Sequence, residues 1–189
     1  LQQLYFAYFA RPADPAGLDY WLEEGTSTKA FAANMYLQQE FISVNGSLSI
    51  QAQINNIYQN LFFRDADAKG LNYWTQQIQT GKLVLASIAN DLIWAAQNNK
   101  GSADDKDCLG NRANAAIAYT AKIKEKPIIE PPGIRPILPY TEDSESIEKG
   151  KSYMKAIGCG YPPSALPSLI EVWLPRGVNI AGPGVQSKL

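Results

Sequence analysis

The stretch that decides the fold is Leu4–Trp21, LYFAYFARPADPAGLDYW, because it returns as Ile57–Trp74, IYQNLFFRDADAKGLNYW, at a constant offset of 53 residues. Such a repeat is typical of a supersecondary unit that cannot bury its apolar face alone and packs against its copy. We therefore expect the copies to form two halves of one core. They agree, in one order, at Tyr5/Tyr58, Phe9/Phe62, Arg11/Arg64, Ala13/Ala66, Asp14/Asp67, Gly17/Gly70, Leu18/Leu71, Tyr20/Tyr73 and Trp21/Trp74.

Each copy is predicted to form a helix, a turn and a second helix. The first helix spaces its large apolar residues three and four positions apart, so that they share one face. Arg11 and Arg64 lie where this helix ends, and a cation there can bond the last free carbonyl groups. Asp14 and Asp67 follow as N-caps of the second helix, with Pro15 at its first position in the first copy. The apolar residues are Leu1, Leu4, Tyr5, Tyr8 and Phe9, and then Ile50, Ile54, Ile57, Tyr58, Leu61 and Phe62.

A glycine lies in the first turn of each second helix, at Gly17 and Gly70. Glycine is a poor helix former, so its presence indicates that another backbone or an aromatic ring comes close. Trp21 and Trp74 follow one turn later and are interpreted as core residues.

The motif R-x-x-D-x-x-G-L-x-Y-W after an aromatic helix, with Gln39-Glu40-Phe41 closing the first copy and Asn111–Thr120 further on, resembles a bacterial domain of unknown function, number 4214. The resemblance covers roughly residues 1–123. That family recurs in surface-layer proteins and in haemolysin-type, calcium-binding secreted proteins. The resemblance implies a helical fold similar to phycobilisome linker domains, and it implies no particular activity.

Composition excludes several classes of function. The 189 residues include no histidine, which excludes a histidine base in a serine or cysteine nucleophile system and histidine-ligated zinc, copper or haem. A net charge of −1 argues against a surface for nucleic acid or anionic membrane. No segment reaches the ~18–20 apolar residues of a membrane span, since the nearest, Leu83–Ala96, is broken by Asn90 and Asp91.

The chain divides into a helical repeat domain, residues 1–126, and a proline-rich arm, residues 127–189. We expect the domain to be all-α, with about six or seven helices built from two related helix-turn-helix halves. The acidic residues Asp104, Asp105 and Asp107 are interpreted as a solvated helix start. The later helices are predicted at Lys29–Ser43, Ala68–Gln79, Leu83–Gln97 and Ala103–Lys124.

The arm holds ten of the 12 prolines, between Pro127 and Pro183. Its first part should run extended, near polyproline II, and its apolar residues indicate that it lies on a surface of its own domain or of a neighbouring subunit. A short helix is predicted at residues 144–157, and Leu169–Leu174 has strand composition. The arm residues expected to make contacts are Ile128, Ile129, Ile134, Ile137, Leu138 and Trp173.

The two cysteines, Cys108 and Cys159, cannot form a metal site by themselves. They could form a disulfide that pins the arm to the helical part, which suits an exported protein. The alternative is two separate buried thiols.

A calcium site is the sharpest cofactor hypothesis. Asp65 and Asp67 supply oxygens at positions one and three of a loop with Gly70 at position six, but Lys69 and Gln76 stand at positions five and twelve, where ligands belong. We therefore favour helix capping for Asp67 and predict no cofactor.

Other patterns give weaker signals. The acidic pairs Glu23/Glu24, Glu142/Asp143 and Glu145/Glu148 each lie on one short stretch, whereas the two carboxylates of a glycosidase flank a cleft. The tryptophans Trp21, Trp74, Trp94 and Trp173 could stack on sugars.

The sequence therefore predicts a non-catalytic structural protein, secreted or on the cell surface. We expect it to assemble with copies of itself or with an envelope partner through the arm. The alternatives are a module that binds cell-surface carbohydrate and an intracellular scaffold that resembles linker domains.

Overall fold

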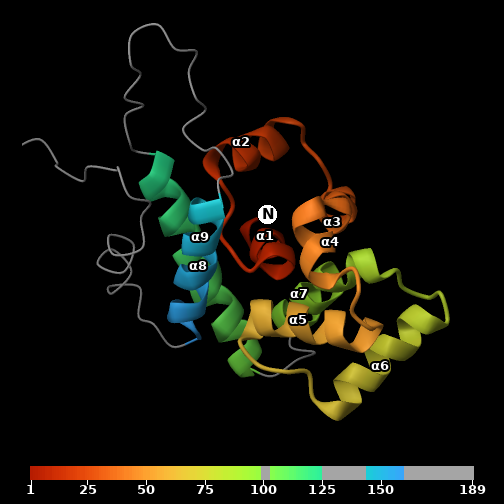
Figure 1. Ribbon diagram of the computed structural model, residues 1–189. Coiled ribbons are helices and arrows are strands. Elements are labelled where there is room, and N and C mark those ends of the chain that lie inside the picture. Colours follow the sequence, from red (N-terminus) through yellow and green to blue (C-terminus); the bar gives the residue numbers. More distant parts are fainter. Residues whose placement is uncertain (99–102, 125–143, 160–189) are drawn as a thin grey trace, which may run out of the picture.

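The computed structural model describes residues 1–98, 103–124 and 144–159, and these residues are helical with no strand (Figure 1). The all-α class predicted from the sequence is confirmed. None of the described helices is both long enough and apolar enough to cross a membrane. The helices are α1 Gln2–Phe9, α2 Pro15–Glu23, α3 Thr28–Leu37, α4 Gln39–Asn45, α5 Ile50–Phe62, α6 Ala68–Gln79, the 3-10 turn η1 Leu85–Ser87, α7 Ile88–Gln97, α8 Ala103–Lys124 and α9 Ser144–Ile157.

The repeat in the sequence is a repeat in space. The first helices of the two copies, α1 and α5, pack together, and the side-chain amide of Asn60 donates to the carbonyl oxygen of Ala7 at 2.9 Å. Each of these helices ends in a residue with a left-handed backbone, Ala10 with φ 59° and Phe63 with φ 55°. Ala10 and Phe63 hold the same repeat position, so the two copies share even this uncommon conformation.

The turn after each first helix is held in the same way. The backbone N–H of Ala13 donates to the side chain of Gln2 at 2.9 Å, and that of Ala66 donates to Asn55 at 3.1 Å. Gln2 and Asn55 are again equivalent positions, although their residue types differ. The structural repeat therefore extends to positions at which the two copies have different residues.

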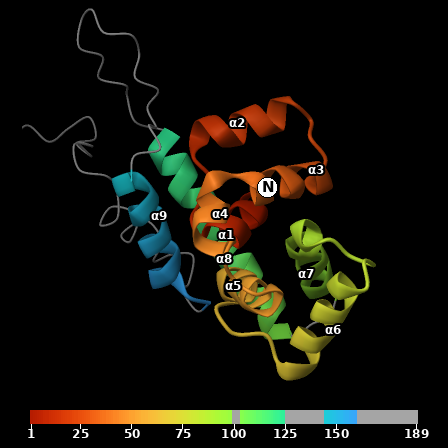
Figure 2. The ribbon, with the colours of Figure 1, turned by 45° about the vertical axis from the view of Figure 1, so that its right-hand side comes forward.

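The core forms around α1, which other helices surround in both views (Figures 1 and 2). Phe6 and Ala7 at the centre of α1 are fully buried. Helix α9 joins the same core through Tyr153, Met154 and Ile157, which are at most 1% exposed, and it packs along α8. The helix predicted inside the proline-rich arm is thus part of the helical body.

The helices are more numerous than expected, because residues 1–126 contain α1 to α8 among their described residues. The helix predicted at Lys29–Ser43 is two helices, since Gln38 has an extended backbone with ψ 143°. Leu37, the last residue of α3 before this break, is 71% exposed. Part of the helix predicted at Leu83–Gln97 is instead the 3-10 turn that precedes α7. The helices α6, α8 and α9 have the predicted bounds.

The extended part of the arm lies outside the described residues. This applies to Leu169–Leu174 and to the contact residues Ile128, Ile129, Ile134, Ile137, Leu138 and Trp173. The assembly role assigned to them stays a prediction.

Candidate ligand-binding cleft

The motif residues begin the second helix of each copy. Asp14 accepts a hydrogen bond from the backbone N–H of Gly17 at 2.6 Å, and Asp67 accepts one from Gly70 at 2.9 Å. Both carboxylates are N-caps, of α2 and α6. The Gly70 bond lowers the pKa of Asp67, because it favours the charged carboxylate.

The motif arginines contact carboxylates. Arg11 donates two hydrogen bonds to Glu40 on α4, at 2.9 and 2.8 Å. Arg64 donates two to Asp105 on α8, at 2.8 and 2.7 Å, and these bonds raise the pKa of Arg64. Each arginine also donates to a carbonyl group in the turn just after its helix, and each stacks on two rings of its own first helix.

The interpretation of Asp105 as part of a solvated helix start is wrong. Asp105 is 5% exposed, because α8 begins against the turn that carries Arg64. Burial of this carboxylate is tolerated because a bidentate guanidinium neutralises it.

Cys108 and Cys159 form a disulfide across 51 residues, which joins α8 to the end of α9. Asp65 and Asp67 each have a separate protein partner, since Asp65 accepts from Gln59 at 2.9 Å. Within the described part of the chain, no three of the residues that commonly bind metals form a cluster.

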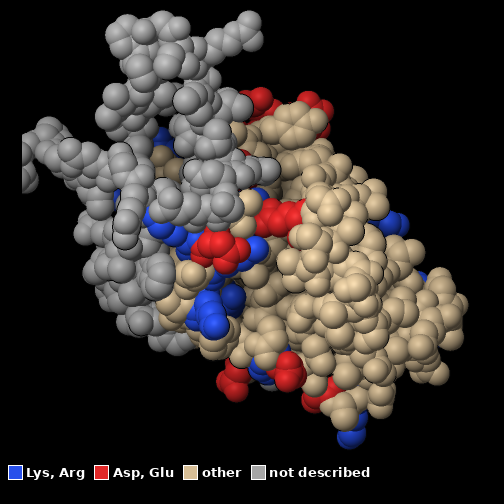
Figure 3. All heavy atoms as spheres, viewed as in Figure 1, with Lys and Arg blue, Asp and Glu red and all other residues tan. Residues whose placement is uncertain are grey.

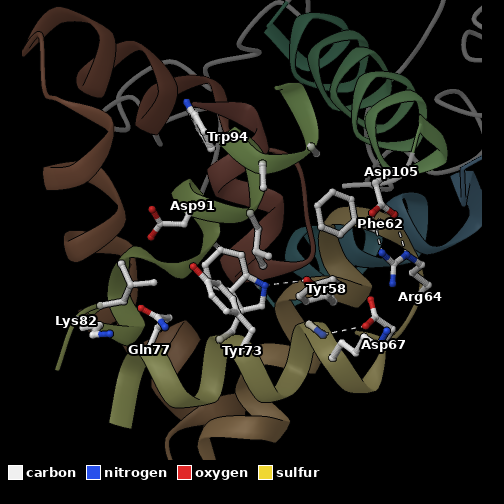
Figure 4. A pocket seen from close by; sticks show the side chains of 17 residues that line it. Tyr58, Phe62, Arg64, Asp67, Tyr73, Gln77, Lys82, Asp91, Trp94 and Asp105 are labelled. Atoms are coloured by element: carbon white, nitrogen blue, oxygen red, sulfur yellow. Dashed lines mark hydrogen bonds and ion pairs between the residues drawn. The ribbon is translucent and has the colours of Figure 1, made fainter. Parts of the chain in front are cut away.

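A cleft of about 820 Å³ opens in the second copy, between α5, α6, α7 and the start of α8 (Figure 4). The ion pair of Arg64 and Asp105 lies at one end, and Gln77 and Lys82 lie at the other. The cleft is lined by Tyr58, Phe62, Arg64, Asp67, Lys69, Gly70, Tyr73, Trp74, Gln77, Lys82, Leu83, Asp91, Leu92, Trp94, Ala95, Ala96 and Asp105.

Aromatic rings dominate the wall of this cleft. Tyr73 is 53% exposed and Trp94 is 57% exposed, so both rings are accessible to a ligand in the cleft. Trp74 is held in place because its indole N–H donates to the hydroxyl of Tyr58 at 3.0 Å and its ring meets the Tyr73 ring edge-on at 4.9 Å. The wall therefore combines a fixed tryptophan with two accessible rings.

Polar side chains lie in the same cleft as these rings. Gln77 and Lys82 come from the end of α6 and the turn after it, and Asp91 comes from α7. Asp91 accepts from the hydroxyl of Ser87 at 3.2 Å, and burial raises its pKa. The cleft thus offers hydrogen-bond donors and acceptors around an aromatic surface.

The two copies differ at this place. Helices α3 and α7 bury residues at the same spacing, Phe31, Ala32 and Met35 in one and Ile88, Ala89 and Leu92 in the other. In the first copy, the ring of Phe31 packs edge-on against Trp21 at 5.2 Å. The second copy has the smaller Ile88 at the corresponding spacing, and Ile88 is not among the residues that line the cleft.

The four tryptophans predicted to stack on sugars do not lie at one site. Trp74 and Trp94 line one cleft, Trp21 packs on Phe31, and Trp173 lies outside the described residues. Both Trp21 and Trp74 are half-buried against the core. The sequence reasoning missed Tyr73, Gln77, Lys82 and Asp91 as lining residues. Only Tyr73, inside the repeated motif, carried a signal that could have identified it.

Comparison with known protein families gives a match that covers all of the second copy of the motif. Residues 32–100 match the family described as domain of unknown function DUF4214, which is the family that the motif resembles. This segment contains most of the cleft. No curated protein and no solved structure matches the chain.

Proposed function

We propose that this DUF4214-containing chain is a non-catalytic protein, secreted or on the cell surface, that binds carbohydrate in the cleft between α6 and α7. The observation that carries the proposal is the exposure of Tyr73 and Trp94, each more than half exposed, in a cleft that also contains Gln77, Asp91 and Lys82. Exposed apolar surface gathered in one place is more informative than single exposed rings, because such patches often mark binding sites.

Carbohydrate suits this combination of groups. The apolar face of a sugar ring stacks on aromatic side chains, and its hydroxyl groups need donors and acceptors at the edge of the stack. Sites for small ligands usually join aromatic walls to a few placed polar groups. A cleft of about 820 Å³ lies within the size range of small-molecule binding sites.

The proposal of a non-catalytic role rests on the carboxylates of the cleft. Asp105 is bound by Arg64 and Asp67 caps α6, so both have structural tasks. Asp91 alone remains, whereas acid-catalysed hydrolysis of a glycosidic bond uses two carboxyl groups on opposite sides of the substrate. The absence of histidine from the chain supports the same conclusion.

The disulfide supports export. Disulfides form and persist outside the reducing cytosol. The bond between Cys108 and Cys159 therefore favours a secreted or surface location over an intracellular scaffold.

A glycan array with the full-length chain tests the proposal. Tyr73→Ala should abolish binding, and Tyr20→Ala should leave it unchanged. Tyr20 is a matched control because it holds the same repeat position, is 55% exposed and meets its neighbouring tryptophan edge-on at 5.1 Å, but does not line the cleft. Equal losses in the two variants, or no binding by the unmodified chain, would contradict the proposal.

Self-association is the second candidate function. Large apolar side chains that follow one another along α3, α4 and the next turn are exposed, with Leu37 at 71%, Val44 at 53% and Ile42 at 43%. We propose a second copy as the partner, with the predicted apolar arm as the contacting segment. An envelope protein is the alternative partner.

Light scattering coupled to size exclusion separates these possibilities. Leu37→Lys with Val44→Lys, in the full chain, should convert an oligomer to a monomer. Removal of all residues after Lys126 is not a clean test, because it also removes α9 from the core. A monomeric unmodified chain would contradict self-association and leave the carbohydrate proposal intact.

A further inference from the structure

Within the described part of the chain, three arginines lie against pairs of aromatic rings, and one of them differs from the others. Arg112 on α8 lies 5.7 Å from the ring of Phe6 and 5.5 Å from that of Phe63. Arg11 and Arg64 each have a bidentate carboxylate partner. Arg112 has no carboxylate partner among the described residues, although it is only 2% exposed.

Two of the three nitrogens of the Arg112 guanidinium donate hydrogen bonds to backbone carbonyl oxygens. Nε donates to Asn60 at 3.0 Å, and Nη1 donates to Met154 at 3.0 Å and Gly158 at 3.1 Å. The third nitrogen, Nη2, has no acceptor among the described residues. Burial without a neutralising anion lowers the pKa of Arg112 to about 10. A buried cation of this kind is costly unless an anion compensates it.

A cavity of about 390 Å³ lies next to this guanidinium. Lys151 and Lys155, one turn apart on α9, line it together with Arg112 and Ser152. Glu148 is the acidic group of the lining and pairs with Lys151 at 3.1 Å, but its side chain is 68% exposed. Figure 3 shows basic groups over α9, with acidic groups among them, next to a face with few charges. Positive charge therefore exceeds negative charge in the lining.

We propose that this cavity binds a small oxyanion, a carboxylate, sulfate or phosphate group, on Nη2 of Arg112. Arginine presents paired donors that match the planar oxygens of such groups, and charge-assisted bonds of this kind are among the strongest in proteins. Lys151 and Lys155 supply further charge at the rim, and the hydroxyl of Ser152 supplies a neutral donor. The anion neutralises Arg112 as Glu40 and Asp105 neutralise the other two arginines.

This site is independent of the aromatic cleft, with which it shares no lining residue. An anion carried by a larger ligand and a free inorganic ion would use the same groups. The two sources are separable, because a free ion binds as inorganic phosphate or sulfate, whereas a ligand-borne group binds only as part of an acidic molecule such as a uronic acid.

Thermal unfolding of the oxidised, full-length chain tests the site. Phosphate, sulfate and glucuronate are titrated against chloride at constant ionic strength. At least one of the three should raise Tm along a saturable curve, as expected for a ligand that binds only the folded state. Lys151→Gln with Lys155→Gln should weaken that binding about fivefold or more, because two of the charges are lost. The control, Lys106→Gln at the exposed start of α8, should leave it unchanged.

A second readout does not depend on stability. The side-chain Nε–H resonance of Arg112 should shift during the titration, while those of Arg11 and Arg64 stay in place. No saturable effect of any of the three anions would overturn the proposal. Equal affinity in the double lysine variant, or equal shifts of all three arginines, would overturn it as well.

Discussion

The hydroxyl oxygen of Tyr5 lies 2.5 Å from the position that a Cβ atom would occupy at Gly17. In the second copy, the hydroxyl of Tyr58 lies 3.3 Å from the corresponding position at Gly70. A tyrosine hydroxyl of the first helix therefore approaches the glycine of the second helix in both copies, and it leaves no room for a side chain at Gly17. The indication that an aromatic group approaches this glycine is confirmed.

The two glycines should respond differently to substitution. Gly17→Ala should destabilise the protein by about 1–3 kcal/mol, because the new methyl group overlaps the Tyr5 hydroxyl and the Asp14 carboxylate. Gly70→Ala should lie within about 1 kcal/mol of the unmodified chain, because better helix propensity offsets a milder contact. Urea denaturation measures both. Tyr5→Phe should relieve part of the Gly17→Ala cost, and equal costs at the two glycines would refute this account.

The ion pair of Arg11 and Glu40 should contribute strongly to stability. Glu40→Gln removes the bidentate charge partner of the Arg11 guanidinium, whose side chain is 5% exposed, and leaves it only the longer ion pair with Asp14 at 3.8 Å among the ion pairs described for it. We expect a loss of about 2–3 kcal/mol in the free energy of unfolding. Glu23→Gln on exposed α2 is the control and should change it by less than about 0.5 kcal/mol. Similar effects of the two substitutions would show that the buried pair has no special weight.

The disulfide should stabilise the attachment of α9. Replacing Cys108 and Cys159 together by alanine, or reducing them, should lower the free energy of unfolding by about 2–4 kcal/mol, because the bond closes a long loop in the unfolded chain. Denaturation with and without reductant measures the effect. The alanine variant should be insensitive to reductant, and a reductant effect of equal size in that variant would contradict the assignment.

Asp67 should make stability depend on pH in acid. Its folded pKa is lowered, so its contribution is present above the unfolded pKa and is lost as the pH falls through the folded pKa. Asp67→Asn retains a capping group without a charge. The stability difference between the unmodified chain and this variant should therefore be largest near neutral pH and shrink below about pH 4. A difference that grows in acid would have the wrong sign for this cap.

Local signals made much of the fold predictable. The start of α6 follows from its cap at Asp67, and the end of α9 follows from the glycine after Ile157. The break at Gln38 was not predictable, because no proline or glycine marks it. Whether a helix forms depends largely on residues that are close in the sequence, so it can be predicted from the sequence alone.

The site was less predictable, since it depends on which helices meet. The pairing of Arg64 with Asp105 joins residues 41 apart, and the burial of α9 depends on contacts with α8. The cleft is lined by residues of α5, α6, α7 and the start of α8, which are distant from one another in the sequence. The repeat predicted that the two copies have similar structures. It did not predict which copy holds the candidate site, which lies in the second.

The most direct test of the central claim is a nitrogen–proton NMR titration of the full chain with the best glycan found on the array. The account predicts that the indole N–H resonances of Trp74 and Trp94, which line the cleft, shift together along one saturable curve, while that of Trp21 does not move. A shift of the Trp21 resonance while those of Trp74 and Trp94 stay in place would contradict this prediction. The absence of any shift with every glycan tested would contradict it as well.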